Sequence, residues 1–258
     1  MASLSAHGLE GLPEVRAGDD LAELIVAAAG ERPIGEGTLV AVAHKAVSKS
    51  EGAVVSLAGV RPSRRARELA TRMAGTNGAA EKDAREIEVV LEQSAELLRA
   101  ERGVLICRTY HGLVCANAGV DASNVPGEEE LVLLPKDPDA SARRIRRGLR
   151  ARLGAAPAVM ITDSFGRTWR HGQLDVAIGL AGLQPLDDWR GRTDSHGLQL
   201  RATWLAIADA AAACADLARA KDSREPVVLV EGLARFTTAE DGPGAAALRR
   251  APEEDLFR

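Results

Sequence analysis

Two lysines four residues apart, Lys45 and Lys49, stand out among the residues that could do chemistry. They occupy a polar segment, 44–52, that directly follows an apolar stretch expected to form a strand. A lysine ammonium is a compact charge suited to neutralising phosphate oxygens, and loops at strand ends commonly carry binding residues. The segment is therefore a candidate phosphate-binding site, although a solvated turn explains it equally well.

Two aspartates, Asp121 and Asp163, also follow apolar stretches, and Asp163 is succeeded by a hydroxyl residue and a nearby glycine. Magnesium and manganese ions prefer oxygen ligands, and they often bind one or two carboxylates together with substrate phosphates. The two aspartates are therefore candidate ligands of a divalent cation, and Arg167 and Arg170 add positive charge after the second one. The alternative for each aspartate is a helix cap or a solvated turn.

A further polar segment, 133–146, contains two prolines that shape a rigid loop, and Asp139 is expected to cap the helix that follows. The arginines of this helix are better explained as a solvated face than as a nucleic-acid patch, because the chain has a net charge of −4. Together, four polar segments after apolar strands favour an enzyme for a polyanionic substrate. The segments are 44–52, 117–125, 133–146 and 162–173.

The bulk composition narrows the class of protein. The 258 residues are 46% apolar, which suits one large domain or two small ones. No apolar run approaches the roughly 20 residues of a membrane span, and the N-terminus lacks the pattern of a secretory signal. Three cysteines at unrelated spacings make no disulfide framework, so a soluble, cytoplasmic protein with buried thiols is expected.

Lysine is rare in this chain. Only five of the 33 basic residues are lysines, so arginine is the default cation, as is common in alanine-rich chains from GC-rich genomes. A lysine that persists against this background is a candidate for a role in which a compact ammonium is needed.

The pattern of apolar residues predicts an alternation of helices and strands without a strict βαβ rhythm, which favours the α+β class with mixed or antiparallel sheets and packed helices. Asp19 or Asp20 is expected to cap the first helix, and the apolar stretch 173–183 is left unassigned. The expected helices cover 21–29, 64–74, 84–100, 141–154 and 198–220, and the expected strands cover 38–44, 54–57, 104–110, 112–118, 130–135, 156–163 and 226–230.

Several longer motifs resemble the coenzyme F-420:L-glutamate ligases, a family that extends the tail of a deazaflavin redox cofactor with γ-linked glutamates. The motifs occur in order and span nearly the whole chain. They are GLPEVRAGDDLAELI at 11–25, HKAVSKSEG at 44–52, NAGVDASNV at 117–125, LLPKDPDASARRIR at 133–146, TDSFGRTWRHGQLDVAIGLAGL at 162–183, DWRGRTDSHGLQL at 188–200 and EEDLF at 253–257.

The resemblance implies a gamma-glutamyl ligase-type fold over residues 1–258, with any boundary between two subdomains left open, in an intertwined homodimer whose site lies near the subunit interface. It implies a GTP-dependent amide ligase that uses Mg²⁺ or Mn²⁺ at two sites, with K⁺ as a further ion. The substrates would be a coenzyme F-420 precursor, L-glutamate and GTP, and the reaction would pass through an acyl phosphate. Neither nucleic acid nor a membrane is an expected partner.

The resemblance also assigns roles to individual residues. The catalytic residues would be Lys49, Asp121 and Asp163. The metal ligands would be Asp121, Asp163 and Ser164. The nucleotide would contact Leu12, Pro13, Glu14, Val15, His44, Lys49 and Asn124.

Three positions depart from the family pattern. His44 stands where the family usually has Ser or Thr, Ala220 stands at an expected glycine, and Glu231-Gly232 replaces Arg-Gly after the last strand. These departures motivate an alternative, a paralogous ligase that uses the same acyl-phosphate chemistry on a different acid or amine. A non-catalytic nucleotide-sensing dimer is a more distant alternative, against which the two retained carboxylates argue.

Overall fold

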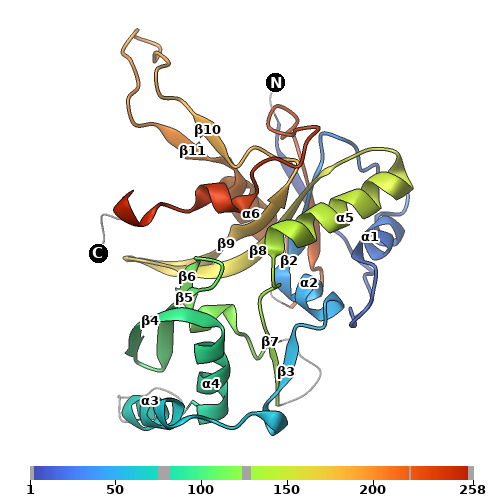
Figure 1. Cartoon of the computed structure of the whole chain (residues 1–258). Coiled ribbons are helices and arrows are strands. Elements are labelled where there is room, and N and C mark those ends of the chain that lie inside the picture. The colour runs from blue at the N-terminus through green and yellow to red at the C-terminus, as the bar shows by residue number, and fades with distance from the viewer. Residues whose placement is uncertain (1–2, 75–81, 124–128, 221, 255–258) are drawn as a thin grey trace.

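A five-stranded sheet forms the centre of the computed structural model, which describes residues 3–74, 82–123, 129–220 and 222–254 (Figure 1). All neighbouring strands are antiparallel except β2 and β8, which run parallel. The sheet is therefore mixed, and the α+β class expected from the sequence is confirmed. The strand order is β1 (Ser5–Gly8), β12 (Val227–Glu231), β2 (Leu39–Ala43), β8 (Ala158–Arg167) and β9 (Arg170–Ala181).

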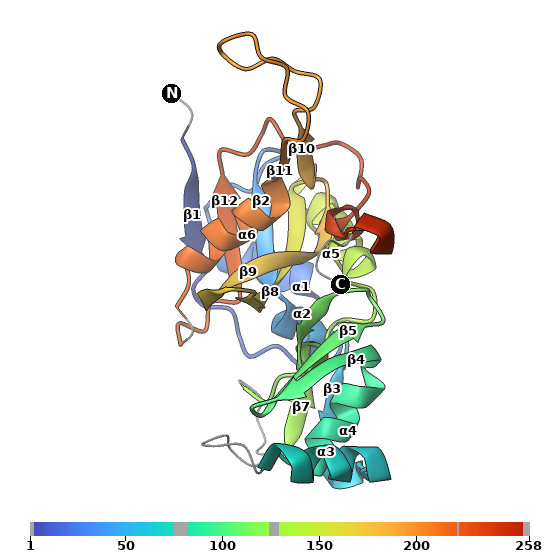
Figure 2. The same cartoon turned by 90° about the vertical axis from the view of Figure 1, so that its left-hand side faces the viewer.

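Strand β2 is apolar along its whole length, and helices cover both faces of the sheet. Val40 and Val42 point into a core shared with α1 and α5, whereas Leu39 and Ala41 point into a second core shared with α6. Figure 2 shows α6 on one side of the sheet and α5 on the other. A strand buried on both faces has a continuous apolar run instead of an alternating one. The helices are α1 (Leu21–Ala29), α5 (Pro138–Leu153) and α6 (Ile207–Leu217).

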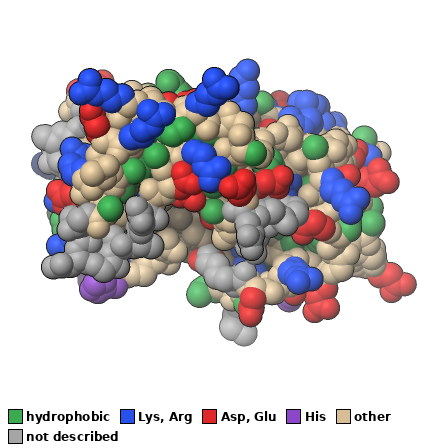
Figure 3. Space-filling view, turned by 90° about the horizontal axis from the view of Figure 1, so that it is seen from below, with side chains coloured by type: hydrophobic (Ala, Val, Ile, Leu, Met, Phe, Trp, Pro, Cys, Tyr) green, Lys and Arg blue, Asp and Glu red, His purple; other side chains and the backbone are tan. Residues whose placement is uncertain are grey.

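A smaller unit lies below the central sheet in Figure 1. A three-stranded sheet packs there on two helices around its own apolar core, and a two-stranded ribbon lies beside them. Basic and acidic side chains are interspersed over the face seen from this end (Figure 3). The elements are α3 (Arg64–Ala74), α4 (Ala84–Glu92), β4 (Ser94–Glu101), β5 (Val104–Thr109) and β6 (Val114–Ala116), with the ribbon of β3 (Val54–Ser56) and β7 (Glu130–Val132).

Two predicted helices are shorter than expected because strand pairing takes over part of each. The helix predicted over 84–100 ends at Glu92, and the residues from Ser94 onward pair with β5 as β4. The helix predicted over 198–220 begins only at Ile207, since the three residues before it form a strand. Apolar spacing reports a local preference, and a strand partner elsewhere in the chain can override it.

Two polar segments expected to be loops form regular structure instead. Residues 44–50 form the short helix α2 (His44–Ser50), directly after β2. Segment 162–173 belongs to the long β8–β9 hairpin, and β9 also contains most of the unassigned stretch 173–183. The polar side chains at these positions are therefore carried by a backbone that helix and sheet hydrogen bonds fix in place. No helix in the described part of the chain is long and apolar enough to span a membrane.

A two-stranded arm extends away from the central sheet (Figures 1 and 2). It is formed by β10 (Leu186–Asp188) and β11 (Trp204–Ala206), which pair antiparallel. The Arg190 guanidinium lies over the Trp204 ring, 4.1 Å from its centroid. Leu198 and Leu205 on the arm are 69% and 43% exposed.

The start of α5 differs from the sequence-based expectation. Asp137 caps the helix by accepting a hydrogen bond from the N–H of Ala140, whereas Asp139 lies inside the first turn. The Asp139 carboxylate accepts hydrogen bonds at 2.8 Å from the backbone N–H groups of Leu180 and Ala245. Asp139 therefore ties the helix to β9 and to the C-terminal segment, a role that only the packed structure reveals.

Arg146 on α5 is buried, which corrects the expectation that the arginines of this helix form a solvated face. Its guanidinium forms an ion pair with Asp241 at 2.8 Å. It also donates hydrogen bonds to the carbonyl oxygens of Pro157, Thr238 and Ala239. Arg146 thus connects α5 to the segment after β12 and to the residue before β8. A planar guanidinium with five N–H donors is suited to bind several acceptors at once.

Replacing Arg146 with methionine tests this connection. Arg146→Met leaves Asp241 and several carbonyl oxygens without their donor, so a loss of about 3 kcal/mol in the free energy of unfolding is expected. Thermal denaturation followed by circular dichroism measures this loss as a lower melting temperature. Arg147→Met, on the exposed side of the same helix, is the matched control and should leave the melting temperature unchanged. Equal melting temperatures for the two variants would contradict the assignment.

Candidate functional site

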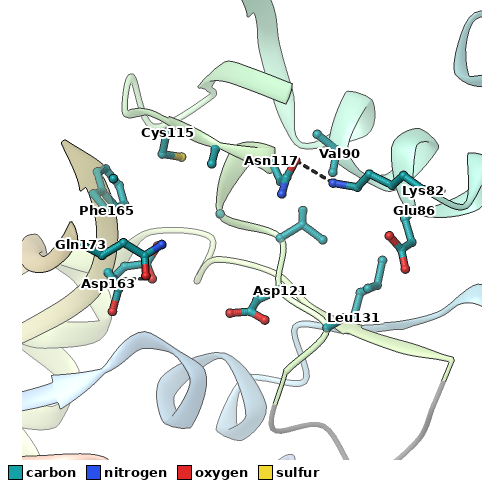
Figure 4. A pocket seen from close by; sticks show the side chains of 16 residues that line it. Lys82, Glu86, Val90, Cys115, Asn117, Asp121, Leu131, Asp163, Phe165 and Gln173 are labelled. Atoms are coloured by element: carbon teal, nitrogen blue, oxygen red, sulfur yellow. Dashed lines mark hydrogen bonds between the residues drawn. The ribbon is translucent and has the colours of Figure 1, made fainter. Parts of the chain in front are cut away.

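A cavity of about 320 Å³ opens between the tip of the β8–β9 hairpin and the smaller unit. Asp163, Phe165 and Gln173 line it from the hairpin, whereas Lys82 and Asp121 line it from the smaller unit (Figure 4). The two aspartates singled out in the sequence, 42 positions apart, therefore meet in one cavity. We call it the carboxylate cavity.

Asp121 lies in an ion pair with Lys45, whose ammonium is 2.7 Å from the Asp121 carboxylate. The second carboxylate oxygen accepts a hydrogen bond at 2.6 Å from the backbone N–H of Ser123. Burial by itself would raise the pKa of Asp121, but the Lys45 ammonium and the Ser123 N–H more than offset this and hold it below its ordinary value. Asp121 is therefore ionised at neutral pH, as a ligand for a cation must be.

Asp163 faces a buried histidine on α2. Nε2 of His44 lies 3.3 Å from Oδ1 of Asp163, and the side chain of His44 is almost fully buried. Among the described residues, no atom makes a well-aligned hydrogen bond to this ring nitrogen. The same carboxylate oxygen accepts a hydrogen bond from the backbone N–H of Ser164 at 2.8 Å. The Ser164 N–H thus orients the Asp163 carboxylate at the edge of the carboxylate cavity, with the His44 ring beside it.

The hydroxyl of Ser164 also lines the cavity and donates a hydrogen bond at 2.7 Å to Asp175. Asp175 is buried and forms an ion pair with Arg219, which follows α6. Arg219 in turn donates to the hydroxyl of Thr162 at 2.7 Å. A buried carboxylate of this kind needs a paired cation to remain charged, so Arg219 indirectly fixes the Ser164 side chain. The sequence indicated neither Asp175 nor Arg219.

Lys49 lies on the same helix as Lys45, one turn further on, and pairs with the exposed Glu14. This contact places the segment 12–15 against α2. Within the segment Val15 is buried in the main core, Leu12 packs against that core, and Pro13 is exposed. None of the four lines the carboxylate cavity. Asn124 lies outside the described residues.

The cavity is also lined by Lys82 and Glu86, which sequence patterns did not single out, by Asn117 at the start of the polar segment 117–125, and by Cys115. Lys82 precedes α4 and donates a hydrogen bond at 2.7 Å to the side-chain oxygen of Asn117. Cys115 is opposite Cys107 in the β5–β6 pairing, and both thiols are buried, as expected. Burial raises the pKa of Cys115 to about 12, which leaves the thiol protonated and a poor nucleophile. The rarity of lysine was the one feature of the sequence that could have drawn attention to Lys82.

The donors of the carboxylate cavity suit a hard divalent cation that shares its ligands with a substrate. Within the described residues, no group of three or more His, Cys, Asp or Glu side chains forms a complete metal site. Two carboxylates, Asp121 and Asp163, do line one cavity together with the Ser164 hydroxyl. Magnesium commonly binds one or two carboxylates and takes its other ligands from phosphates and water, and this donor set fits that pattern.

Comparison with known proteins gives the family. A model of the "F420-0:Gamma-glutamyl ligase" family matches residues 11–232. The chain is 41% identical to the "Coenzyme F420:L-glutamate ligase" of Methanopyrus kandleri, over 100% of both chains. The protein of the same name from Methanothermobacter thermautotrophicus is 39% identical over 99% of both chains. The one from Halobacterium salinarum is 42% identical over 99% of this chain and 96% of its own. The chain belongs to this ligase family.

As a member of the F420-0:gamma-glutamyl ligase family, the protein is a ligase that forms a C–N bond. The structure shows the surroundings of two of the three departures from the family pattern, His44 and Glu231-Gly232. His44 fills the buried position beside Asp163. Gly232 has a φ of 94°, and a Cβ added there would lie 2.0 Å from the carbonyl oxygen of Ser3, so glycine is required. Glu231 accepts a hydrogen bond at 3.4 Å from the Ser5 hydroxyl on β1.

The coupling between Lys45 and Asp121 can be tested in the protein without nucleotide or metal. In Lys45→Met burial acts on Asp121 without the neighbouring ammonium, so the pKa of Asp121 is expected to rise. NMR titration of ¹³C-carboxyl-labelled aspartates measures this pKa, with the resonance assigned from an Asp121→Asn spectrum. Lys136→Met removes an exposed lysine outside the carboxylate cavity and serves as the control. An Asp121 titration identical in both variants would show that Lys45 does not set its charge.

Proposed function

We propose that this protein adds L-glutamate through a γ-linked amide to a coenzyme F-420 precursor, in a reaction that requires GTP and Mg²⁺ or Mn²⁺. The observation that carries the proposal is that Asp121 and Asp163 line one cavity in a chain of this family. Full-length relatives named for glutamate ligation to F420 support the choice of substrates. K⁺ is a further ion that the site is proposed to use.

The chemistry needs an activated acid, because a carboxylate does not condense with an amine unaided. In the proposed first step, a carboxylate oxygen of the acceptor attacks the γ-phosphorus of GTP, the bond to the β–γ bridging oxygen breaks, and GDP leaves. In the second, the glutamate nitrogen attacks the acyl carbon, the carbon–oxygen bond to phosphate breaks, and inorganic phosphate leaves. The amine loses its proton on the way to the amide. Such phosphoryl transfer depends mainly on positioning and charge neutralisation.

The residues of α2 and the cavity supply that positioning. Lys49 is proposed to exchange its partner Glu14, which is exposed, for a phosphate oxygen of the nucleotide. Asp121 and Asp163 are proposed to hold one divalent cation and Ser164 to contribute to a second. When bound, these cations neutralise charge on the phosphates. The contact between Lys49 and the segment 12–15 supports a nucleotide site beside the carboxylate cavity.

A second candidate function is favoured by His44. The family usually carries a small hydroxyl residue there, and an imidazole facing Asp163 changes the contact next to the proposed phosphates. A paralogous ligase with the same acyl-phosphate chemistry would then act on a different acid or amine. The two functions share their metal and phosphate residues and differ in the organic substrates.

Mass spectrometry of the acceptor tests the main proposal. Incubation with the precursor cofactor, L-glutamate, MnCl₂ and GTP is expected to add the mass of one or more glutamyl groups, whereas ATP in parallel is not. Asp163→Ala should abolish this addition, because the proposed cation then loses one of its two carboxylates. Circular dichroism and thermal denaturation are expected to show that the variant stays folded.

Two results would count against this function. Undiminished glutamate addition by Asp163→Ala would remove Asp163 from the metal site. Phosphate release with another acid or amine, but not with the precursor and glutamate, would favour the paralogous ligase.

We also propose that two copies of the chain form a homodimer through the β10–β11 arm. The arm pairs only with itself among the described strands and extends beyond the rest of the molecule (Figure 1). Leu198, Trp204 and Leu205 expose large apolar side chains on it. Exposed apolar side chains gathered on one projecting element are typical of a surface that another chain covers.

Light scattering during gel filtration measures the assembly directly. The wild-type protein is expected at twice the chain mass of 27.2 kDa. Leu198→Glu combined with Leu205→Glu should shift it to the mass of one chain, because two carboxylates cannot be buried unpaired at an interface. Glu10→Gln, at an exposed position outside the arm, is the control. A monomeric wild-type protein would overturn the proposal.

A further inference from the structure

The wall of the carboxylate cavity opposite the β8–β9 hairpin carries one cationic and one anionic side chain. Lys82 and Glu86 extend from the start of α4 toward the cavity, and Asp121 lies between them and Asp163 (Figure 4). Neither side chain belongs to the set assigned above to phosphates or cations. The two sides of the cavity thus differ in charge. Asp121 and Asp163 make one side negative, whereas Lys82 and Glu86 give the other side one positive and one negative charge.

Among the described residues, the hydrogen-bond partner of the Lys82 ammonium is a neutral oxygen. The ammonium donates to the side-chain oxygen of Asn117, and no carboxylate of the described residues forms an ion pair with it. Glu86 likewise forms no ion pair with any described residue, although its charge is close enough to influence Lys82. Both side chains are half-buried. A partly buried charge without a partner is costly, so a ligand that supplies the opposite charge would gain from binding there.

The backbone beneath Lys82 is held in an unusual conformation. Asn117 and Ala118 have φ values of 51° and 53°, a left-handed region that alanine rarely adopts. This conformation lets the Asn117 side-chain oxygen accept hydrogen bonds from both Lys82 and the backbone N–H of Leu105, the latter at 3.2 Å. Such backbone strain is often found where a side chain must be placed accurately. Asn117 is therefore a positioning residue for the Lys82 ammonium.

The partial burial of the Lys82 ammonium also favours binding of an anion. Burial lowers the pKa of Lys82 from its ordinary value, and the Glu86 carboxylate partly opposes this. A desolvated ammonium binds a carboxylate more strongly than an exposed one does, because water competes less.

We infer that Lys82 and Glu86 form the subsite for the incoming amino acid, in which Lys82 binds a carboxylate of L-glutamate and Glu86 faces its ammonium group. A free α-amino acid carries both charges, so it complements a cation and an anion on one wall. The phosphates of a nucleotide carry only negative charge and complement the lysines of α2 instead. This inference rests on the proposed function, because it assigns the second substrate of that reaction.

Steady-state kinetics and calorimetry with Lys82→Met test the subsite. The KM for glutamate is expected to rise on the order of tenfold or more, since a charge-assisted hydrogen bond is lost, while the KM values for GTP and for the acceptor stay close to wild type. Lys82→Arg, which keeps the charge, should recover part of the loss. Lys136→Met removes a lysine from a different cavity and should leave all three KM values unchanged.

Direct binding separates failure of the subsite from failure of the proposed function. Calorimetric titration of L-glutamate into the protein with a non-hydrolysable GTP analogue and Mg²⁺ is expected to show binding for wild type and weakened binding for Lys82→Met and Glu86→Gln. Equal glutamate affinity in wild type and Lys82→Met, or no binding to wild type, overturns the subsite. A rise in the acceptor KM instead of the glutamate KM overturns it as well. A wild-type protein that binds glutamate at Lys82 but adds none to the precursor contradicts the proposed function alone.

Discussion

The parallel pairing of β2 with β8 is the constraint on which the candidate site depends. In its register Ala43 lies opposite Thr162, so the next residues, His44 and Asp163, lie side by side at the point where β2 ends. β8 continues beyond this point to Arg167, so Asp163 lies within a strand and faces the first residue of α2. The other strand pairs of the central sheet are antiparallel.

A charged contact, Lys45 with Asp121, connects the smaller unit to α2. Lys45 reaches from α2, the helix that follows β2, to Asp121, which lies in the segment that follows β6. The same contact keeps Asp121 ionised although it is partly buried, because the ammonium offsets the effect of burial. This one ion pair therefore both connects the smaller unit to α2 and keeps the Asp121 carboxylate charged. Three of the four described lysines, Lys45, Lys49 and Lys82, lie on α2 or at the carboxylate cavity, in a chain whose usual cation is arginine.

Sequence patterns predicted most helices and strands because their determinants are local. The helix cap at Asp20 and the strands expected over 104–110 and 112–118 all follow from neighbouring residues and are confirmed. The predictions failed where a distant partner decides. Residues after Gln93 keep a helical spacing but pair with β5, and the polar residues after Ala43 form a helix because the core receives Val47.

The sequence by itself determined the α+β class, the family and the two aspartates, since motifs and apolar periodicity are properties of order along the chain. Only the tertiary structure decided which charges meet. It paired Arg146 with Asp241 and Arg219 with Asp175, and it brought Lys82 to the cavity of Asp163. Ion pairing depends on separation in space and on burial, which long-range strand pairing sets and which spacing along the chain does not record.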